Sequence, residues 1–256
     1  MIRTILKKAG LLVYARYLRE KYLPSKSQIR EKNSIDKRKS FYGQFIKSND
    51  LCFDVGANIG NRTKVFLALG AKVVAVEPQS DCVKMLTLRF KNRITIVQKA
   101  LGQKDGDGVI YIGESSAISS LSKDWISAVA SARFKGKKWN TEQKVDITTL
   151  DKLISTYGRP AFCKIDVEGY EQEVLKGLTS RIPFLSFEYA VPERINEITN
   201  CLNELDRVGQ YVCNYTIGEK MEFKLADWVS REELISYVKL VAAKQTFGDI
   251  YIHFVN

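Results

Sequence analysis

The residues 51–63, LCFDVGANIGNRT, are of the types that could bind a nucleotide-like cofactor. The pattern predicts a strand that ends near Asp54, a tight turn with Gly56 and Gly60, and a helix directly after it. Glycine permits a positive φ and a close approach of the backbone to a ligand. The free N–H groups at the start of a helix also point toward such a turn. Because many strand–helix corners contain glycine, this turn alone is weak evidence for a cofactor.

Glu77 supplies the second half of the signal, 23 residues after Asp54. An acidic residue at the end of the second strand, about 20 positions after the glycine turn, can accept both hydroxyls of an adenosine ribose. NAD and S-adenosylmethionine both carry that ribose. The turn distinguishes them, because Ala57 and Asn58 replace the closely spaced second glycine of a dinucleotide site, and Asp54 would repel a pyrophosphate. The corner therefore favours S-adenosylmethionine over NAD.

Three carboxylates form the expected catalytic group: Asp166, Glu168 and Glu188. Asp166 and Glu168 follow the apolar run of residues 161–165, and Glu188 lies in a second run, residues 183–189. The carboxyl ends of such strands face the ligand crevice of an α/β sheet. If residues 166–168 continue the strand, its alternation would turn Asp166 and Glu168 to the same side. We expect this group to orient an acceptor hydroxyl and remove its proton.

Two other roles are open for these carboxylates. Glu168 could cap a helix that begins at Gly169, where the helix dipole favours a negative charge. The three together could bind Mg²⁺ or Ca²⁺, which prefer oxygen ligands. Because many carboxylates at strand ends bind no metal, none is included in the predicted site.

Other residues are weaker candidates. His253 is the only histidine and could act as a base, but it alternates with apolar residues, which favours a structural role in the last strand. The segment 115–121, SSAISSL, could contact the acceptor or be an ordinary loop. Trp125, Phe134 and Trp139 lie in a basic stretch and could stack on a sugar, or belong to a mobile lid.

Short apolar runs alternate with helical patterns behind these residues. This alternation predicts an α/β fold, a doubly wound and mostly parallel sheet built from right-handed βαβ units. Ser80 and Asp81 are expected to cap the second helix. The strands are expected at 51–55, 72–78, 94–100, 161–167 and 183–189, with an extra strand pair at 106–113 and a closing pair at 211–215 and 248–255; the helices are expected at 61–70, 80–92, 169–178 and 194–209.

The positive charge is concentrated at the N-terminus. Residues 1–50 contain 13 Lys/Arg and 4 Asp/Glu, whereas the rest of the chain contains 27 and 25. We predict an N-terminal helical extension over 1–45, with an amphipathic helix over 2–22 and a basic linker or exposed helix over 25–40, and a catalytic domain over 46–256. The extension could cap the domain or, through residues 1–40, lie on an anionic membrane. The nearly neutral main domain argues against a nucleic-acid partner.

The cysteines and the apolar runs indicate the compartment. The five cysteines form no CxxC pair and are odd in number, which argues against zinc or a disulfide framework and favours a reducing environment. No apolar run approaches the roughly 18 residues of a spanning helix. The apolar piece Leu11–Ala15 is too short for a secretory signal. We expect a cytoplasmic protein that can associate with a membrane surface; its oligomeric state is open.

The sequence resembles the FkbM-type methyltransferases. The matching segments, in order, are FDVGANIG (53–60), VEP (76–78), ITTLDKLI (147–154), KIDVEGYEQEVLKG (164–177) and Glu188, so the resemblance covers about residues 50–190. It implies a Rossmann-like class I fold, S-adenosylmethionine as donor, and O-methylation of sugar or polyketide-type hydroxyls. The alternatives are an RNA or protein methyltransferase and a cofactor-binding module without catalysis.

The resemblance also implies roles for individual residues. Asp54, Gly56, Asn58 and Gly60 would line the methionine part of the cofactor, and Glu77 would hold the ribose. Asp166 would face the methyl-transfer centre. Beside the adenine would lie Gln98, Lys99 and Ala100.

Overall fold

A computed structural model describes residues 11–192, 194–242 and 244–255 of the chain, without the side chains of residues 27 and 30–32. A seven-stranded sheet forms its centre, with the strand order β3-β2-β1-β7-β8-β10-β9. The first five of these strands run parallel, and β10 runs antiparallel to both of its neighbours. The strands are β3 (Thr95–Val97), β2 (Lys72–Val76), β1 (Leu51–Val55), β7 (Phe162–Ile165), β8 (Phe184–Val191), β10 (Thr246–Phe254) and β9 (Tyr211–Tyr215).

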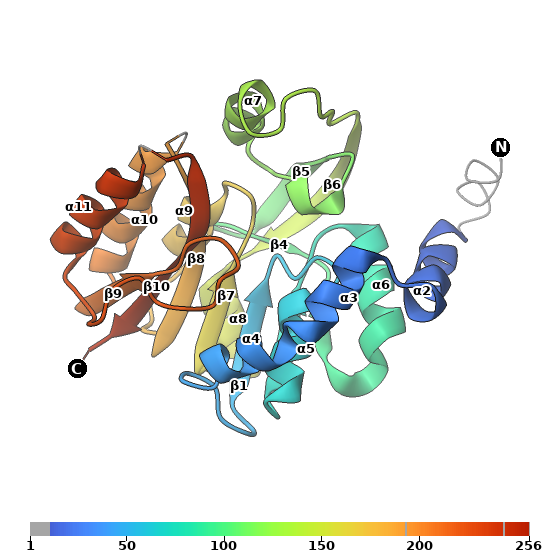
Figure 1. The fold of residues 1–256 in the computed structure, drawn as a ribbon, viewed down its shortest axis with the longest axis horizontal. Helices are drawn as coiled ribbons and strands as arrows, with labels where there is room; N and C mark the ends of the chain where they lie inside the picture. Colours follow the sequence, from blue (N-terminus) through green and yellow to red (C-terminus); the bar gives the residue numbers. More distant parts are fainter. Residues whose placement is uncertain (1–10, 193, 243, 256) are drawn as a thin grey trace.

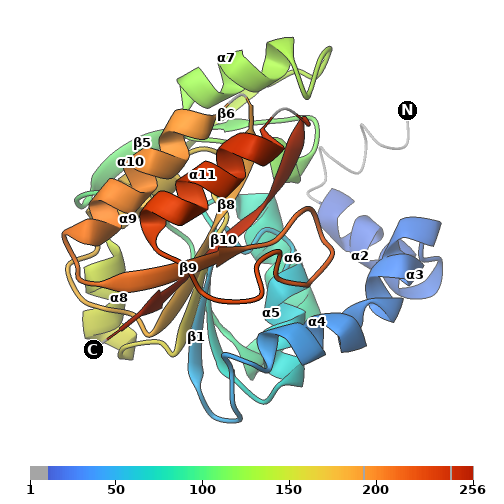
Figure 2. The same ribbon diagram turned by 60° about the vertical axis from the view of Figure 1, so that its left-hand side comes forward.

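Helices cover both faces of this sheet, as Figures 1 and 2 show. Apolar residues of α8 (Leu150–Tyr157), α9 (Glu171–Lys176), α10 (Ile195–Asp206) and α11 (Arg231–Val241) share the larger core cluster with the strands. The opposite face is covered by α4 (Ile35–Tyr42), α5 (Asn61–Ala68) and α6 (Ser80–Phe90). The predicted doubly wound α/β fold is therefore confirmed.

A smaller sheet lies beyond the carboxyl ends of the central strands (Figure 1). It has the order β4-β6-β5, from β4 (Ala100–Leu101), β6 (Thr141–Thr148) and β5 (Gly106–Ile112), and α7 (Lys123–Ser131) follows β5 in the chain. The strand expected over 94–100 is thus divided between the two sheets. The pair expected within 106–113 is wrong, because β5 pairs along its whole length with β6, which was not predicted.

The start of α6 also differs from the prediction. Its N-cap residue is Gln79, and no side chain caps it. Ser80 instead accepts a hydrogen bond at its Oγ from Gln98 Nε2 at 3.1 Å. The predicted cap by Ser80 and Asp81 is therefore wrong, because the helix begins at Ser80, one residue earlier than a Ser80 cap requires.

Three helices form the described N-terminal region: α2 (Leu12–Tyr22), α3 (Lys26–Asn33) and α4. The part of the expected first helix over residues 2–10 lies outside the described residues. α2 packs against α6, where Glu20 forms an ion pair with Arg89. Phe41 and Tyr42 of α4 are buried together with Phe45 in the second core cluster. Residues on both sides of the predicted boundary between the extension (1–45) and the catalytic domain (46–256) therefore pack in one core cluster.

Two further features of the structure concern the state of the cysteines and the presence of membrane-spanning helices. All five cysteines are buried and unpaired in the structure. Among the residues that the structure describes, no helix has the length and apolarity needed to cross a bilayer.

Candidate functional site

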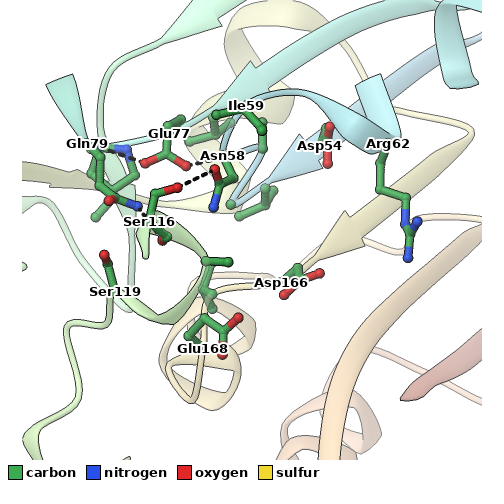
Figure 3. A pocket seen from close by; sticks show the side chains of 18 of the residues that line it. Asp54, Asn58, Ile59, Arg62, Glu77, Gln79, Ser116, Ser119, Asp166 and Glu168 are labelled. Carbon is green, nitrogen blue, oxygen red and sulfur yellow. Dashed lines mark hydrogen bonds between the residues drawn. The ribbon is translucent and has the colours of Figure 1, made fainter. Parts of the chain in front are cut away.

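A pocket of about 400 Å³ opens where β1, β2, β7 and β8 end, beneath the small sheet. In the sheet, β1 lies beside β7. From β1 the chain continues outward to β2 on one side, and from β7 it continues outward to β8 on the other, so the strand order reverses between β1 and β7. This change of direction in the strand order is where doubly wound sheets bind ligands. Figure 3 shows Glu77, Asn58 and Ser116 toward one side of the pocket, Arg62 toward the other, and Asp166 between them.

Gly56 allows the loops after β1 and β7 to touch. Its φ is +77°, and a Cβ at this position would lie 1.8 Å from the carbonyl oxygen of Asp166. Gly60 has a φ of +85°, but a Cβ there would meet the ring of Phe90 at 2.3 Å. Gly56 therefore lines the pocket, whereas Gly60 lets the turn pack on α6 and is not among the lining residues.

The Glu77 carboxylate is held by two backbone N–H groups. Asn58 N donates to Oε2 and Gln79 N donates to Oε1, each at 2.7 Å. Burial raises the pKa of Glu77 to about 7, although these two hydrogen bonds oppose the shift. Each carboxylate oxygen keeps a further lone pair. Glu77 can therefore accept two neighbouring hydroxyls, as a ribose presents them.

Asp54 and Asn58 continue this side of the pocket. Thr63 Oγ1 donates to the Asp54 carboxylate at 2.5 Å, and burial raises the pKa of Asp54. Ser116 Oγ donates to Asn58 Oδ1 at 3.0 Å and so attaches the 115–121 segment to the corner. Both Asp54 and Asn58 line the pocket.

The expected adenine residues divide into two groups. Lys99 and Ala100 line the pocket, whereas Gln98 does not, because its side chain bonds to Ser80. Leu101 and Ile110 also line the pocket at this side and were not predicted.

Asp166, Glu168 and Glu188 come together at the floor of the pocket. One carboxylate oxygen from each lies within 4.8 Å of the others. The reason differs from the prediction, because β7 ends at Ile165 and Glu168 has a φ of +52°, so a turn and not strand alternation brings the side chains together. Such a φ in a non-glycine residue costs backbone energy and is common at functional sites.

The electrostatics of the pocket floor favour the protonated form of two of these carboxyls, Glu168 and Glu188. Burial, followed by repulsion from Asp166 and Glu171, raises the pKa of Glu168 well above its ordinary value. Burial, followed by repulsion from Glu168 and Asp166, does the same to Glu188. Their spacing also suits one divalent cation. Metal binding therefore remains an alternative to acid–base chemistry.

The capping role considered for Glu168 is wrong. α9 begins at Glu171, its N-cap residue is Tyr170, and no side chain caps it. The carboxylate that does stabilise this loop belongs to Glu171, which accepts a hydrogen bond from Val167 N at 3.0 Å. Ser120 Oγ donates to the carbonyl oxygen of Glu168 at 2.6 Å, which fixes the backbone of the turn.

Lys164 was missed, although it lies in the most distinctive motif of the sequence. Its side chain is fully buried, and its Nζ lies 3.1 Å from Asp166 Oδ2 and 2.9 Å from Asp249 Oδ1. Burial alone would lower the pKa of Lys164, but Asp166 and Asp249 raise it well above its ordinary value. The available signal was a lysine within an otherwise apolar strand, since a fully buried lysine needs charged partners.

Arg62 and Glu219 line the far side of the pocket and were also missed. Arg62 Nη2 lies 2.6 Å from Glu219 Oε2, and Arg38 Nη2 lies 3.3 Å from the same oxygen. These residues come from α5, the loop after β9 and α4. No local pattern in the sequence joins three such distant segments.

His253 and the three aromatic residues do not line the pocket. His253 stacks on Phe184 with ring centroids 4.3 Å apart, which agrees with the structural role. Trp125 packs against Phe134 and Trp139 and is only 4% exposed. Of the two alternatives considered for these rings, neither is supported by their position, because Trp125 packs with Phe134 and Trp139 in a small apolar cluster apart from the pocket.

The chain matches a family model, a curated relative and several solved structures. A family model described as the methyltransferase FkbM domain matches residues 54–224. The hexuronic acid methyltransferase AglP of Haloferax volcanii is 30% identical over 146 residues, which is 55% of each protein. The chain thus spans about half the length of that curated relative.

Solved structures of methyltransferases are also similar, at low identity. A precorrin-6y C5,15-methyltransferase of Geobacter metallireducens is 10% identical with a TM-score of 0.44, and the match covers 89% of each chain. A TehB-like S-adenosylmethionine-dependent methyltransferase of Corynebacterium glutamicum is 8% identical with a TM-score of 0.43, covering 88% of this chain and 95% of the other.

Proposed function

This chain belongs to the FkbM family of S-adenosylmethionine-dependent methyltransferases, and we propose that it methylates a hydroxyl group of a sugar, glycan or similar small acceptor. The observation that carries the proposal is the acidic trio Asp166, Glu168 and Glu188 at the pocket floor. The name of the Haloferax relative, a hexuronic acid methyltransferase, supports a sugar as the acceptor.

The lining residues fit the cofactor. Asp54, Gly56 and Asn58 would hold the methionine part, Glu77 the ribose, and Lys99 with Ala100 the adenine. Acidic side chains suit a ligand with an ammonium and a sulfonium group. Bound S-adenosylmethionine supplies a methyl group whose bond to sulfur breaks, with its electron pair passing to sulfur, as the acceptor oxygen bonds to the methyl carbon. The products are the methyl ether and S-adenosylhomocysteine.

Glu168 is the group we assign as the base. An alcohol becomes a good nucleophile only as its proton leaves, and a base whose pKa lies near the working pH removes it best. Glu168 has a raised pKa, whereas Asp166 is paired with the buried Lys164. Glu168 would accept the hydroxyl proton, Asp166 would face the methyl-transfer centre, and Glu188 would share the charge and proton of the trio. Alignment of the groups can supply up to about 7–11 kcal/mol.

A direct assay tests the proposal. The purified chain is incubated with S-adenosylmethionine and, in separate reactions, with hexuronic acids, neutral hexoses, RNA and a peptide mixture, and methylated product and S-adenosylhomocysteine are measured by mass spectrometry. We expect both products in equal amounts with a sugar. Methylation of RNA or peptide alone would contradict the assignment, as would methylation of the sugar at a position other than oxygen.

A further inference from the structure

A second cavity, of about 690 Å³, is lined by residues of α2, α3, α4, α5 and α6. Figure 1 shows where these helices lie in the fold. We call this cavity the basic groove. Arg16, Arg38, Ile59 and Asn61 line both this groove and the methyltransferase pocket. The two hollows are therefore contiguous, and one ligand can occupy parts of both.

The walls of the basic groove are strongly cationic. Seven of its lining residues are arginine or lysine and one, Glu20, is acidic. Glu20 accepts hydrogen bonds from Arg16 and Arg89, so its negative charge is already matched. Like charges gathered in a concave surface raise the local positive potential and attract anions. The further cations of the walls are Arg19, Lys21, Lys64 and Arg93, whereas Arg38 is paired with Glu219.

The groove is built from the fold and not from one mobile side chain. Arg89 in α6 donates to the carbonyl oxygen of Ile59 at 2.7 Å and also pairs with Glu20 in α2. These contacts join the wall of the groove to the loop after β1, which lines the cofactor corner. A guanidinium group binds phosphate well, because its planar fork matches two phosphate oxygens at once.

We propose that the basic groove binds the phosphate or diphosphate group of a phosphate-linked sugar, whose sugar ring then reaches the methyltransferase pocket. The inference rests on the proposed function for the identity of the sugar. A diphosphate carries at least two negative charges, which accounts for a cluster of several cations better than the single carboxylate of a free uronic acid.

A longer nucleic-acid ligand fits less well. Residues 51–256 contain 27 Lys/Arg and 25 Asp/Glu, so the positive charge is not continued along the main domain. Binding of RNA needs a series of cations that follow its backbone. The charge distribution therefore favours a short phosphate ligand.

The experiment compares two full-length triple variants. R19Q/K64Q/R93Q removes three charges from the groove and none from the residues that line the methyltransferase pocket. The matched control, K104Q/K144Q/K239Q, removes three charges at exposed positions away from it. Inorganic pyrophosphate is the binding probe in isothermal titration. Since several charge-assisted hydrogen bonds are lost, we expect its Kd to rise at least about tenfold in the groove variant alone.

Activity supplies the second readout. With a hexuronic acid 1-phosphate as acceptor, KM should rise about tenfold in the groove variant, whereas the free hexuronic acid should show unchanged kcat and KM. Acceptors linked to a nucleoside diphosphate or to a prenyl phosphate then identify the source of the phosphate; a preference for either supports the proposal. If no sugar is methylated but pyrophosphate binding still depends on these three residues, the proposed function fails and the phosphate site stands.

Three results would overturn the proposal. The first is equal pyrophosphate affinity in both triple variants. The second is an equal change of KM for the phosphorylated and the free sugar. The third is RNA binding that depends on the same three residues and is not displaced by pyrophosphate.

Discussion

The two halves of the pocket are held together by different kinds of contact. In the half that we assign to the cofactor, called the cofactor half, Asp54, Asn58 and Glu77 lie within 24 positions of one another, and backbone N–H groups hold Glu77. The half that we assign to the acceptor, called the acceptor half, joins Asp166 and Glu168 to Glu188, and Asp166 is paired with the buried Lys164.

This difference predicts that the two halves respond differently to substitution. The cofactor half depends on the backbone turn at Gly56 and on the main-chain N–H groups that hold Glu77. The acceptor half depends on side chains from separate segments, so a substitution in one segment changes its charge and shape without disturbing the cofactor corner. The predictions below separate the halves by changing one at a time.

The largest expected effect is on catalysis by the acceptor half. We expect Glu168→Gln to lower kcat about 10²- to 10⁴-fold, because the acceptor loses its base. The affinity for S-adenosylhomocysteine should change less than about threefold, because the cofactor half is intact. Steady-state kinetics and titration calorimetry measure the two quantities, and Glu142→Gln, at an exposed position on β6, is the control. Full activity in Glu168→Gln would remove Glu168 from the mechanism.

The next effect is on the stability of the protein, through the Lys164–Asp249 ion pair next to the acceptor half. Lys164→Met leaves Asp249 buried without its cation, and we expect the free energy of unfolding to fall by about 3–5 kcal/mol. Urea denaturation measures this change, with Lys144→Met on the surface as the control. The double variant Lys164→Met/Asp249→Asn should recover part of the loss. A single variant as stable as the wild type would show that the ion pair does not support the site.

A change in the cofactor half should have the opposite profile from Glu168→Gln. Glu77→Gln removes one charged acceptor, and we expect the Kd for S-adenosylhomocysteine to rise about 100-fold, or about 2.7 kcal/mol. The kcat at saturating donor should change less than the Kd. Titration calorimetry again gives the Kd, and thermal melting checks that the variant folds. Unchanged affinity would contradict the role of Glu77.

The dependence of kcat on pH tests the acceptor half without a substitution. Because the pKa of Glu168 is raised, the base carries its proton at low pH and cannot accept another. The kcat should therefore rise with pH, roughly tenfold per unit while the base is mostly protonated, and then reach a plateau. A kcat profile between about pH 5 and 9 tests this. A flat profile would argue for an acceptor that needs no base.

The stability of the free protein should respond to pH through Glu77 in the other direction. Its pKa of about 7 in the folded protein exceeds its ordinary value, so the folded state retains a proton that the unfolded state releases. The free energy of unfolding should then decrease as the pH rises from about 4.5 to about 7. Urea denaturation over this range, compared with Glu77→Gln, isolates the contribution. An identical slope in both proteins would exclude it.

The sequence predicted the parts that depend on neighbouring residues. Strand β1, the turn at Gly56 and the acid Glu77 follow one another closely, so their types and spacing were sufficient. The closing strands β9 and β10 were also predicted from alternation. The same was true of β8, where Glu188 continues an apolar run.

The parts that were missed depend on register or on weaker signals. Lys164 meets Asp249, 85 positions later, only because β8 lies between β7 and β10. Strand β6 alternates Val145 and Ile147 with polar residues, a pattern that was available. Helix α11 begins with a capping box of Ser230 and Glu233, which the sequence also contained.

Titration of the purified full-length chain with S-adenosylhomocysteine tests the central claim, that the β1–β2 corner binds the donor, most directly. We predict saturable binding at one site per chain that is weakened in Glu77→Gln and preserved in Glu168→Gln. A folded protein that does not bind S-adenosylhomocysteine, or whose binding depends on Glu168 and not on Glu77, would contradict the account.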